Sequence, residues 1–143
     1  MKKTIVILSL ILLLTGCGNN KLECTIEQEE GGVKTFGTTT LTFENNKIKS
    51  TQIKMDVIIP DEYKSMLELM ISSLNSTYER YKEYGAVVSV EQKSDTNIQA
   101  NISFETSNLT IENLEKLEKE SMYFKGNKNE VKKSLEEEGF ICK

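Results

Sequence analysis

The chain of 143 residues has no histidine and no tryptophan, and Pro60 is its single proline. Without histidine it has neither the Ser-His nor the Cys-His pairs that activate a nucleophile, and it offers no imidazole ligand to a metal. The Asp-x-Asp-x-Asp-Gly pattern of a calcium loop is missing too, and Asp95 and Asn97 alone are more typical of a turn. We therefore expect no enzymatic activity, no metal and no cofactor.

The chain also has no excess of positive charge, because it contains 18 Lys and Arg residues and 22 Asp and Glu residues. The formal net charge of −4 argues against nucleic acid as a partner. Carboxylates are dense in Glu27-Gln28-Glu29-Glu30 and in Glu136-Glu137-Glu138. We interpret both groups as solvated charge, although an enzyme that uses only carboxylates or tyrosine is an alternative.

Long apolar runs are rare, and the one present lies at the N-terminus. Thr4 to Leu14 spans 11 residues after two lysines, whereas a membrane-spanning helix needs about 20. The run matches the apolar region of a cleavable signal peptide. The residues Leu14-Thr15-Gly16-Cys17 resemble the lipobox of bacterial lipoproteins, which implies cleavage after Gly16 and a diacylglyceryl group on Cys17. The alternative is an ordinary signal peptide with an incidental cysteine.

The sequence thus predicts three segments: a signal peptide over 1–16, a lipidated N-terminus with a short tether over 17–21, and a single domain over 22–143. Two or more acyl chains hold a protein stably on a bilayer. Residues 18–21 reach at most roughly 14 Å, so we expect the domain close to the outer face of the bacterial cytoplasmic membrane. Without Lys2 and Lys3 the mature net charge is −6, so the lipid rather than a basic patch must anchor it.

Cysteine is scarce as well, and lipidation of Cys17 would leave Cys24 and Cys142. Export places them where disulfides persist. We predict a disulfide between them, which requires the C-terminus to fold back beside the first strand. Two buried free thiols are the alternative.

Apolar and polar residues alternate in several segments, which predicts strands. Three of them precede residue 60: one begins at Leu22, one ends near Phe43, and one follows Asn45-Asn46, where asparagine tolerates the positive φ of a tight hairpin. Two further strands flank the loop Lys93–Asn97, and Phe140–Cys142 forms a short closing strand.

A change to helical periodicity follows Pro60. One long amphipathic helix is predicted from about Asp61 to Tyr84, and its apolar stripe contains Tyr63, Met66, Leu67, Met70, Ile71, Leu74, Tyr78 and Tyr81. A short helix capped by Thr110 and broken by Lys125-Gly126-Asn127, and a last helix from about Asn129, complete the pattern. The order β-β-β-α-β-β-α-α-β predicts an α+β domain: an antiparallel sheet of five to six strands packed on one long helix.

Aromatic residues are few, and three tyrosines gather on the long helix. Tyr78, Tyr81 and Tyr84 are spaced by three, so they follow one edge of the helix. A tyrosine can stack on a sugar or hold a peptide through its hydroxyl, which makes a ligand-binding groove one interpretation. The other is that Tyr78 and Tyr81 finish the core stripe and Tyr84 lies at its rim.

Several short pieces together resemble the YehR-type small bacterial lipoproteins, a family without an assigned activity. Beside the lipobox, these pieces are Thr40–Glu44, Ile59-Pro60, Tyr81–Gly85, and the passage from Val131–Leu135 to Gly139-Phe140. The resemblance implies a membrane-anchored extracytoplasmic domain and transfers no catalytic residue.

The function expected from these observations is a non-enzymatic envelope domain that binds or scaffolds another surface component. The open face of the sheet, with Thr38, Thr40, Lys54 and Asp56, would be its contact surface. The alternative is a small-ligand receptor accessory to a transporter, which a pocket beside Tyr78 and Tyr81 would favour. At 127 mature residues, the chain is short for a two-lobed binding protein.

Overall fold

The structure is a computed structural model and describes residues 20–120 and 122–143. The predicted signal peptide and the lipidated Cys17 lie outside these residues. In chain order the elements are β1 (Lys21–Glu30), β2 (Val33–Glu44), β3 (Lys47–Ile58), the 3₁₀ turn η1 (Asp61–Met66), α2 (Leu67–Glu83), β4 (Val87–Ser94), β5 (Asn97–Glu105), the 3₁₀ turn η2 (Thr106–Asn108), α3 (Ile111–Lys119), α4 (Lys128–Glu137) and β6 (Ile141–Cys142).

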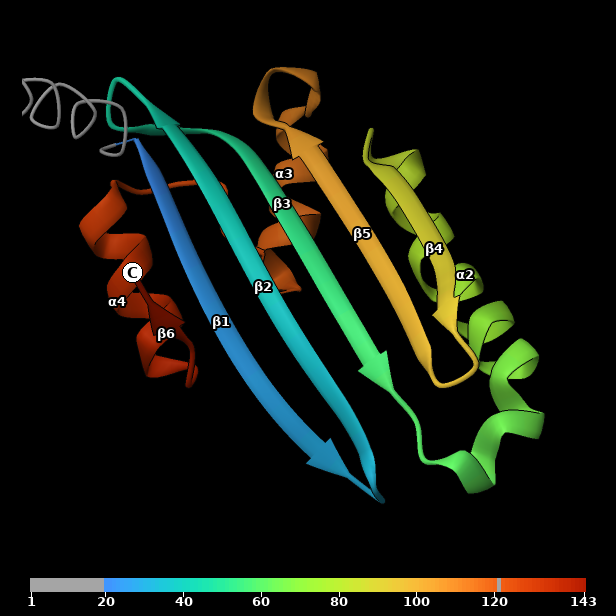
Figure 1. The fold of residues 1–143 in the computed structure, drawn as a ribbon. Helices are drawn as coiled ribbons and strands as arrows, with labels where there is room; N and C mark the ends of the chain where they lie inside the picture. Colours follow the sequence, from blue (N-terminus) through green and yellow to red (C-terminus); the bar gives the residue numbers. More distant parts are fainter. Residues whose placement is uncertain (1–19, 121) are drawn as a thin grey trace, which may run out of the picture.

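One antiparallel sheet of six strands carries the fold, in the order β4-β5-β3-β2-β1-β6. The α-helices lie on one side of it (Figure 1). The core between the layers forms three adjoining clusters, centred on Leu22 and Leu135 under α4, on Phe104 and Leu117 under α3, and on Ile98 and Leu67 under α2. The predicted α+β architecture is confirmed, and the other face of the sheet carries no described helix.

Turns in the sheet follow the local sequence. Asn45 and Asn46 adopt φ angles of 51° and 60°, so the predicted asparagine hairpin joins β2 to β3. A register shift between Thr42 and Phe43 lies opposite the start of β3. Because of this bulge, Ile48 and Thr51, three positions apart, both point to the helical side, where each is buried.

The long helix begins later than the sequence predicts. Residues from Asp61 to Met66 form a 3₁₀ turn, in which the amide of Tyr63 donates to the carbonyl of Pro60 at 3.0 Å, and α2 starts at Leu67. Met66, predicted to lie in the apolar stripe, is 46% exposed. A periodic pattern cannot resolve this, because both kinds of helix bring residues three apart close together.

The segment between α3 and α4 also differs from expectation. Thr110 caps α3 as predicted, by accepting a hydrogen bond from the amide of Asn113, but the helix ends at Lys119. Asn127, interpreted as a breaker, is the N-cap of α4 and forms a capping box with Glu130. Between the two helices Phe124 is buried and packs edge-to-face on Phe104, with ring centroids 5.2 Å apart.

Candidate functional site

The open face of the sheet is mostly polar, and strand alternation determines its composition. One row of cross-strand neighbours runs over five strands through Thr25, Thr38, Lys54, Asn101 and Ser89. A second row runs through Glu27, Phe36, Asp56, Gln99 and Glu91. The same strands turn Cys24, Ile102 and other buried residues to the helices, so the predicted contact residues do lie together.

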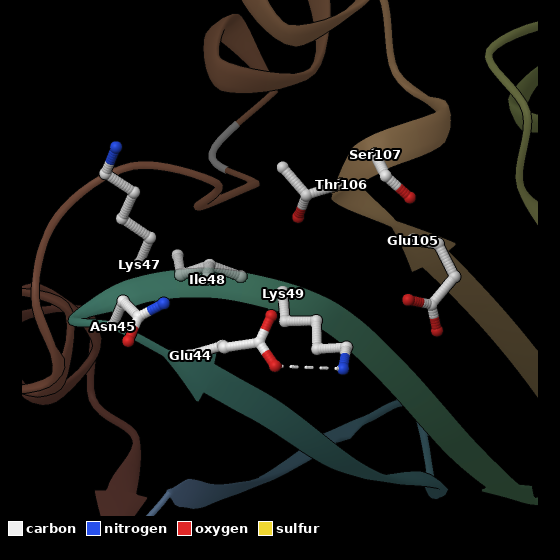
Figure 2. A pocket seen from close by; sticks show the side chains of 8 residues that line it. All are labelled: Glu44, Asn45, Lys47, Ile48, Lys49, Glu105, Thr106 and Ser107. Atoms are coloured by element: carbon white, nitrogen blue, oxygen red, sulfur yellow. Dashed lines mark hydrogen bonds and ion pairs between the residues drawn. The ribbon is translucent and has the colours of Figure 1, made fainter.

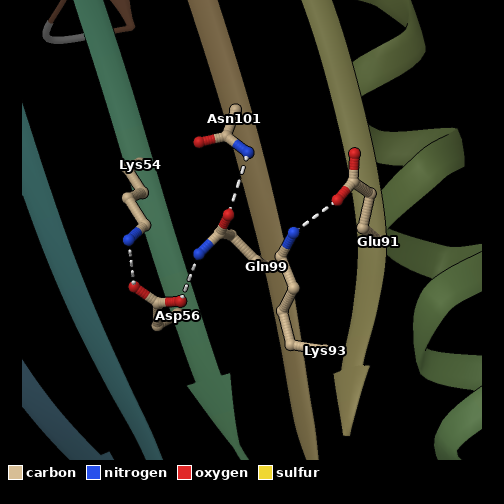
Figure 3. A network of polar contacts seen from close by, with 6 residues as sticks. All are labelled: Lys54, Asp56, Glu91, Lys93, Gln99 and Asn101. Atoms are coloured by element: carbon tan, nitrogen blue, oxygen red, sulfur yellow. Dashed lines mark hydrogen bonds and ion pairs between the residues drawn. The ribbon is translucent and has the colours of Figure 1, made fainter.

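Hydrogen bonds fix several side chains of the open face relative to one another (Figure 3). The Lys54 ammonium lies 3.3 Å from Asp56 Oδ2, and Gln99 donates to Asp56 Oδ1 at 2.8 Å. Asn101 in turn donates to Gln99 Oε1 at 3.4 Å. This chain of contacts crosses from β3 to β5 and holds an ammonium, a carboxylate and two amides in set orientations.

Apolar residues lie at the margins of the open face. Val87 on the edge strand β4 is 73% exposed, and Ile141 on the edge strand β6 is 70% exposed. Their cross-strand neighbours, Ser103 and Thr25, lie on the open face, so both side chains share that side. The open face therefore combines a hydrogen-bonding centre with an exposed apolar residue at each edge and with Phe36 on the interior strand β2.

A cavity of about 200 Å³ lies on the opposite, helical side of the sheet. We call it the Thr51 cavity. Its lining comes from β2, β3, the end of α3 and the C-terminal segment. The lining residues are Thr39, Leu41, Thr51, Ile53, Glu120, Met122, Tyr123, Leu135, Glu138 and Phe140. Thr51 is 2% exposed, and its Oγ1 has no hydrogen-bond partner in the described part of the chain. The walls of the cavity are thus mostly apolar, and the unpaired hydroxyl of Thr51 is buried beneath them with almost no accessible surface.

Two carboxylates stand at the exposed side of the Thr51 cavity. Glu120 Oε2 accepts hydrogen bonds from Tyr81 Oη at 2.7 Å and from the Arg80 guanidinium at 3.0 Å. Glu138 Oε1 accepts one from Tyr123 Oη. The hydrogen bond to Glu138 raises the pKa of Tyr123 to about 12, and burial together with Glu120 raises the pKa of Tyr81.

No pattern in the sequence marks Glu138 as part of this cavity. It belongs to the acidic run interpreted as solvated charge, yet it is bound to Tyr123, which lies 15 positions away in the chain. No periodic pattern links residues in a connecting segment to a helix end. The run Glu27–Glu30, by contrast, is exposed at the end of β1.

Tyr78 and Tyr81 on α2 and Tyr84 at its C-cap do not line the Thr51 cavity. Tyr81 is 5% exposed in the core; its ring stacks on Tyr78 and meets Phe104 edge-to-face, each at 6.2 Å between centroids. The hydroxyl of Tyr78 lies 3.5 Å from Met55 Sδ, and Tyr84 is partly buried at the margin. This arrangement matches the core-stripe interpretation. Tyr81 reaches the cavity only through Glu120.

Another hollow, of about 450 Å³, lies beside the β2–β3 turn (Figure 2). The ion pair between Lys49 and Glu44, at 3.3 Å, crosses one side of it. Most of its lining side chains are charged or polar, and Ile48 is the only large apolar residue among them.

The predicted disulfide is present between Cys24 and Cys142. Residues 20–120 and 122–143 contain no group of three or more Asp, Glu, Cys or His side chains that could hold a metal. In the same residues no helix is both long and apolar enough to cross a membrane.

Comparison with known proteins identifies the fold but no family. No family model matches the chain, and no curated protein matches it. A solved structure that it resembles is the NMR structure of a protein from Streptococcus pneumoniae TIGR4, with a TM-score of 0.58 and 14% sequence identity over 88% of this chain and 87% of that one. At this identity the likeness extends to the fold alone.

Proposed function

We propose that the protein is a lipid-anchored bacterial envelope protein without enzymatic activity, and that its open face binds or scaffolds another component of the cell surface. The observation that carries the proposal is the asymmetry of the sheet: the described helices cover one face, and the other presents ordered polar side chains. The kinship with YehR-type lipoproteins is part of this proposal and rests on the sequence resemblance.

The start of β1 supports a position close to the membrane. Lys21, predicted to belong to the tether, is already in the strand, and the carbonyl of Asn20 accepts a hydrogen bond from the amide of Phe43 at 2.7 Å. An anchor on Cys17 would then leave three steps of chain, roughly 11 Å. The strands would lead away from the bilayer, so the open face would stand to the side and stay accessible to a partner.

The absence of enzymatic activity is supported by chemistry. The chain has no histidine, and the sulfurs of Cys24 and Cys142 are joined, so neither is a nucleophile. The carboxylates at the Thr51 cavity are bound to tyrosine and arginine. An open polar face suits recognition by hydrogen bonds rather than the burial of a large apolar patch.

The anchor is tested by metabolic labelling with an alkyne fatty acid in a bacterial host. We expect the wild-type chain to be tagged and the Cys17→Ser variant to be untagged. An untagged wild-type chain, or one found in the cytosol with its leader intact, would overturn the membrane location.

The open face is tested with a photo-crosslinking amino acid placed at Thr38 or at Gln99 in living cells. Glu115, exposed on α3, is the matched control position on the helical side. We expect a discrete adduct from the two open-face positions and none from the control, and we expect Asn101→Arg to abolish it. Equal labelling from both sides, or no adduct from the open face, would refute this docking surface.

A second candidate function, a small-ligand receptor accessory to a transporter, is favoured by the Thr51 cavity. This cavity is separate from the predicted tyrosine groove, although Glu120 connects it to Tyr81. Binding of a small molecule by the purified chain would support this function, and a labelled ligand that never enters the cell would count against coupling to transport.

A further inference from the structure

We propose that the open face carries a binding site for a neutral carbohydrate chain, with one sugar ring on Phe36 and the next over the hydrogen-bonded residues around Asp56. The inference deepens the proposed docking function by naming a class of ligand, and it rests on that function in taking the open face as the contact surface. A hollow, an aromatic ring inside a polar surface, and a set of oriented donors and acceptors carry it.

A hollow of about 400 Å³ lies over β1, β2 and β6. Residues that line it include Thr25, Glu27, Phe36, Thr38 and Ile141. Strand pairing aligns Thr25 with Thr38 and with Ile141. It also aligns Glu27 with Phe36, so all five side chains project from the open face. The hollow is therefore part of that face, and its volume lies in the range of roughly 300–1,000 Å³ for small-molecule pockets.

Phe36 supplies a stacking surface in this hollow. It lies on an interior strand, its ring is partly exposed, and no described helix covers this side of the sheet (Figure 1). The face of an aromatic ring carries partial negative charge, which attracts the C–H groups on one face of a sugar ring. A sugar on Phe36 would remove apolar surface from water while its hydroxyl groups point to the polar residues around the ring.

Acceptors and donors for those hydroxyl groups lie on the neighbouring strand. Asp56 is the cross-strand neighbour of Phe36, and Lys54 is that of Thr38. The side chain of Asp56 is 27% exposed and that of Lys54 is more exposed, so a ligand can reach both. A carboxylate oxygen accepts more than one hydrogen bond, and an ammonium group donates three. A sugar hydroxyl can therefore donate to Asp56 and accept from Lys54.

The polar network orients these groups before a ligand arrives (Figure 3). Gln99 donates to Asp56 Oδ1 at 2.8 Å, and the Lys54 ammonium lies 3.3 Å from Oδ2. Asn101 orients Gln99 in turn, by donating to its Oε1 at 3.4 Å. Groups that are already held lose less entropy on binding, so the network favours a ligand whose hydroxyl groups match its directions.

The distance between the hollow and the network requires more than one sugar. The hollow is centred over β1 and β2, whereas the contact between Asp56 and Gln99 joins β3 to β5. These two centres are two strand spacings apart, roughly 10 Å. A single ring reaches one of them, and a chain of linked rings reaches both. An open sheet face suits an extended ribbon, the shape of a β-1,4-linked chain, better than a coiled one.

The charges of the site favour a neutral chain. Glu27 and Asp56 are the cross-strand neighbours of Phe36 on its two sides, and Lys54 offsets only one of these carboxylates. The remaining negative charge repels an anionic chain, most strongly at low salt.

The test is an amide NMR titration of the ¹⁵N-labelled full chain with cellohexaose, in a polyoxyethylene detergent that contains no sugar. Three comparison ligands divide the interaction: glucose is a single ring, maltohexaose is a coiled chain, and the β-1,4-linked hexamer of glucuronic acid is an anionic one. We expect cellohexaose to bind saturably and to shift the amides of Phe36 and Thr38 but not that of Glu115 on α3. Glucose should bind at least about tenfold more weakly because it engages one part of the site, and the other two hexamers should also bind more weakly.

Three variants assign the binding to residues. Phe36→Leu keeps an apolar side chain but no ring and should weaken cellohexaose about threefold to tenfold, whereas Phe36→Tyr should retain the affinity. Asp56→Asn keeps the shape of the side chain but removes acceptor capacity and should also weaken binding about threefold to tenfold. The matched control is Asp95→Asn in the exposed segment between β4 and β5, which removes the same charge and should leave the affinity unchanged.

Saturable binding that follows this order and responds to Phe36 and Asp56 supports the proposal. No saturable binding of cellohexaose, full affinity of Phe36→Leu, or equal losses in Asp56→Asn and Asp95→Asn would overturn it. If the crosslinker at Thr38 captures a protein while cellohexaose does not bind, the docking function stands and the carbohydrate site is refuted; if neither result is positive, both fail. Chemical denaturation of each variant shows that a lost affinity is not a lost fold.

Discussion

Cys24 in β1 and Cys142 in β6 are direct cross-strand neighbours, and a disulfide joins them across a sequence separation of 118 residues. Cys24 belongs to the core beneath α4, and β6 consists of only two residues. The C-terminus is thus attached to the edge of the sheet by the two residues of β6, by the disulfide, and by a hydrogen bond from the amide of Lys143 to the carbonyl of Glu23 at 2.9 Å.

Removal of this disulfide is expected to lower the stability considerably. Closing a loop of this length restricts the unfolded chain, which the chain-entropy model values at just under 5 kcal/mol, and losses of about 2–5 kcal/mol are typical. We expect the double variant Cys24→Ala/Cys142→Ala, and the reduced wild type, to unfold at a clearly lower denaturant concentration. An unchanged midpoint would mean that the bond adds no constraint.

Titration of Tyr123 reports on Glu138. The hydrogen bond to Glu138 and partial burial raise the pKa of Tyr123 to about 12, above the unfolded value near 10. The resulting stabilisation is complete below pH 10 and is lost as the pH rises from 10 through 12. In ¹³C-tyrosine NMR we expect Glu138→Gln to lower the pKa of Tyr123 toward 10, whereas Glu27→Gln, on the open face, should leave it unchanged. A value near 10 in the wild type would refute the contact.

The hydroxyl of Tyr81 links α2 to the end of α3. Tyr81→Phe removes its bonds to Glu120 and Arg80 and should lower the free energy of unfolding by about 1 kcal/mol. Tyr81→Ala also removes a buried ring and should cost about 3–5 kcal/mol. Tyr84→Phe is the control, because the described residues give its hydroxyl no hydrogen bond, and equal effects of the two Tyr→Phe changes in urea denaturation would contradict this assignment.

The capping box of α4 can be tested in the same way. Asn127 Oδ1 accepts from the amides of Asn129 and Glu130, so Asn127→Ala should cost about 0.5–2 kcal/mol. Asn129→Ala, at an exposed position in the first turn, should be neutral or slightly stabilising because alanine favours the helix. The reverse order of the two variants in thermal melts would exclude the cap as the cause.

The buried, unpaired hydroxyl of Thr51 is expected to lower the free energy of unfolding. Thr51→Val replaces a buried, unpaired hydroxyl by a methyl group of similar shape and should raise the free energy of unfolding by about 1 kcal/mol. Thr39→Val, at a partly exposed position on the same cavity wall, is the comparison and should have a smaller effect. A marked loss of stability in Thr51→Val would show that the hydroxyl is already paired.

Local sequence determined much of the fold. The alternation in β3 and β5, the asparagine turn, the cap at Thr110 and the cysteine pair all depend on neighbouring residues or on the scarcity of a residue type, and the structure contains each of them. Strand and helix periodicities are readable because they repeat every two residues or about every 3.6.

Contacts between separate elements, including those around the Thr51 cavity, were decided by the tertiary structure. A bulge aligned Ile48 with Thr51, burial of an aperiodic segment placed Phe124 on Phe104, and packing of a helix end brought Glu138 to Tyr123. These contacts join residues whose spacing in the chain follows no period, since they form only when separate elements pack. The sequence by itself therefore determined the layers of the molecule, and only the packing of those layers decided which side chains meet.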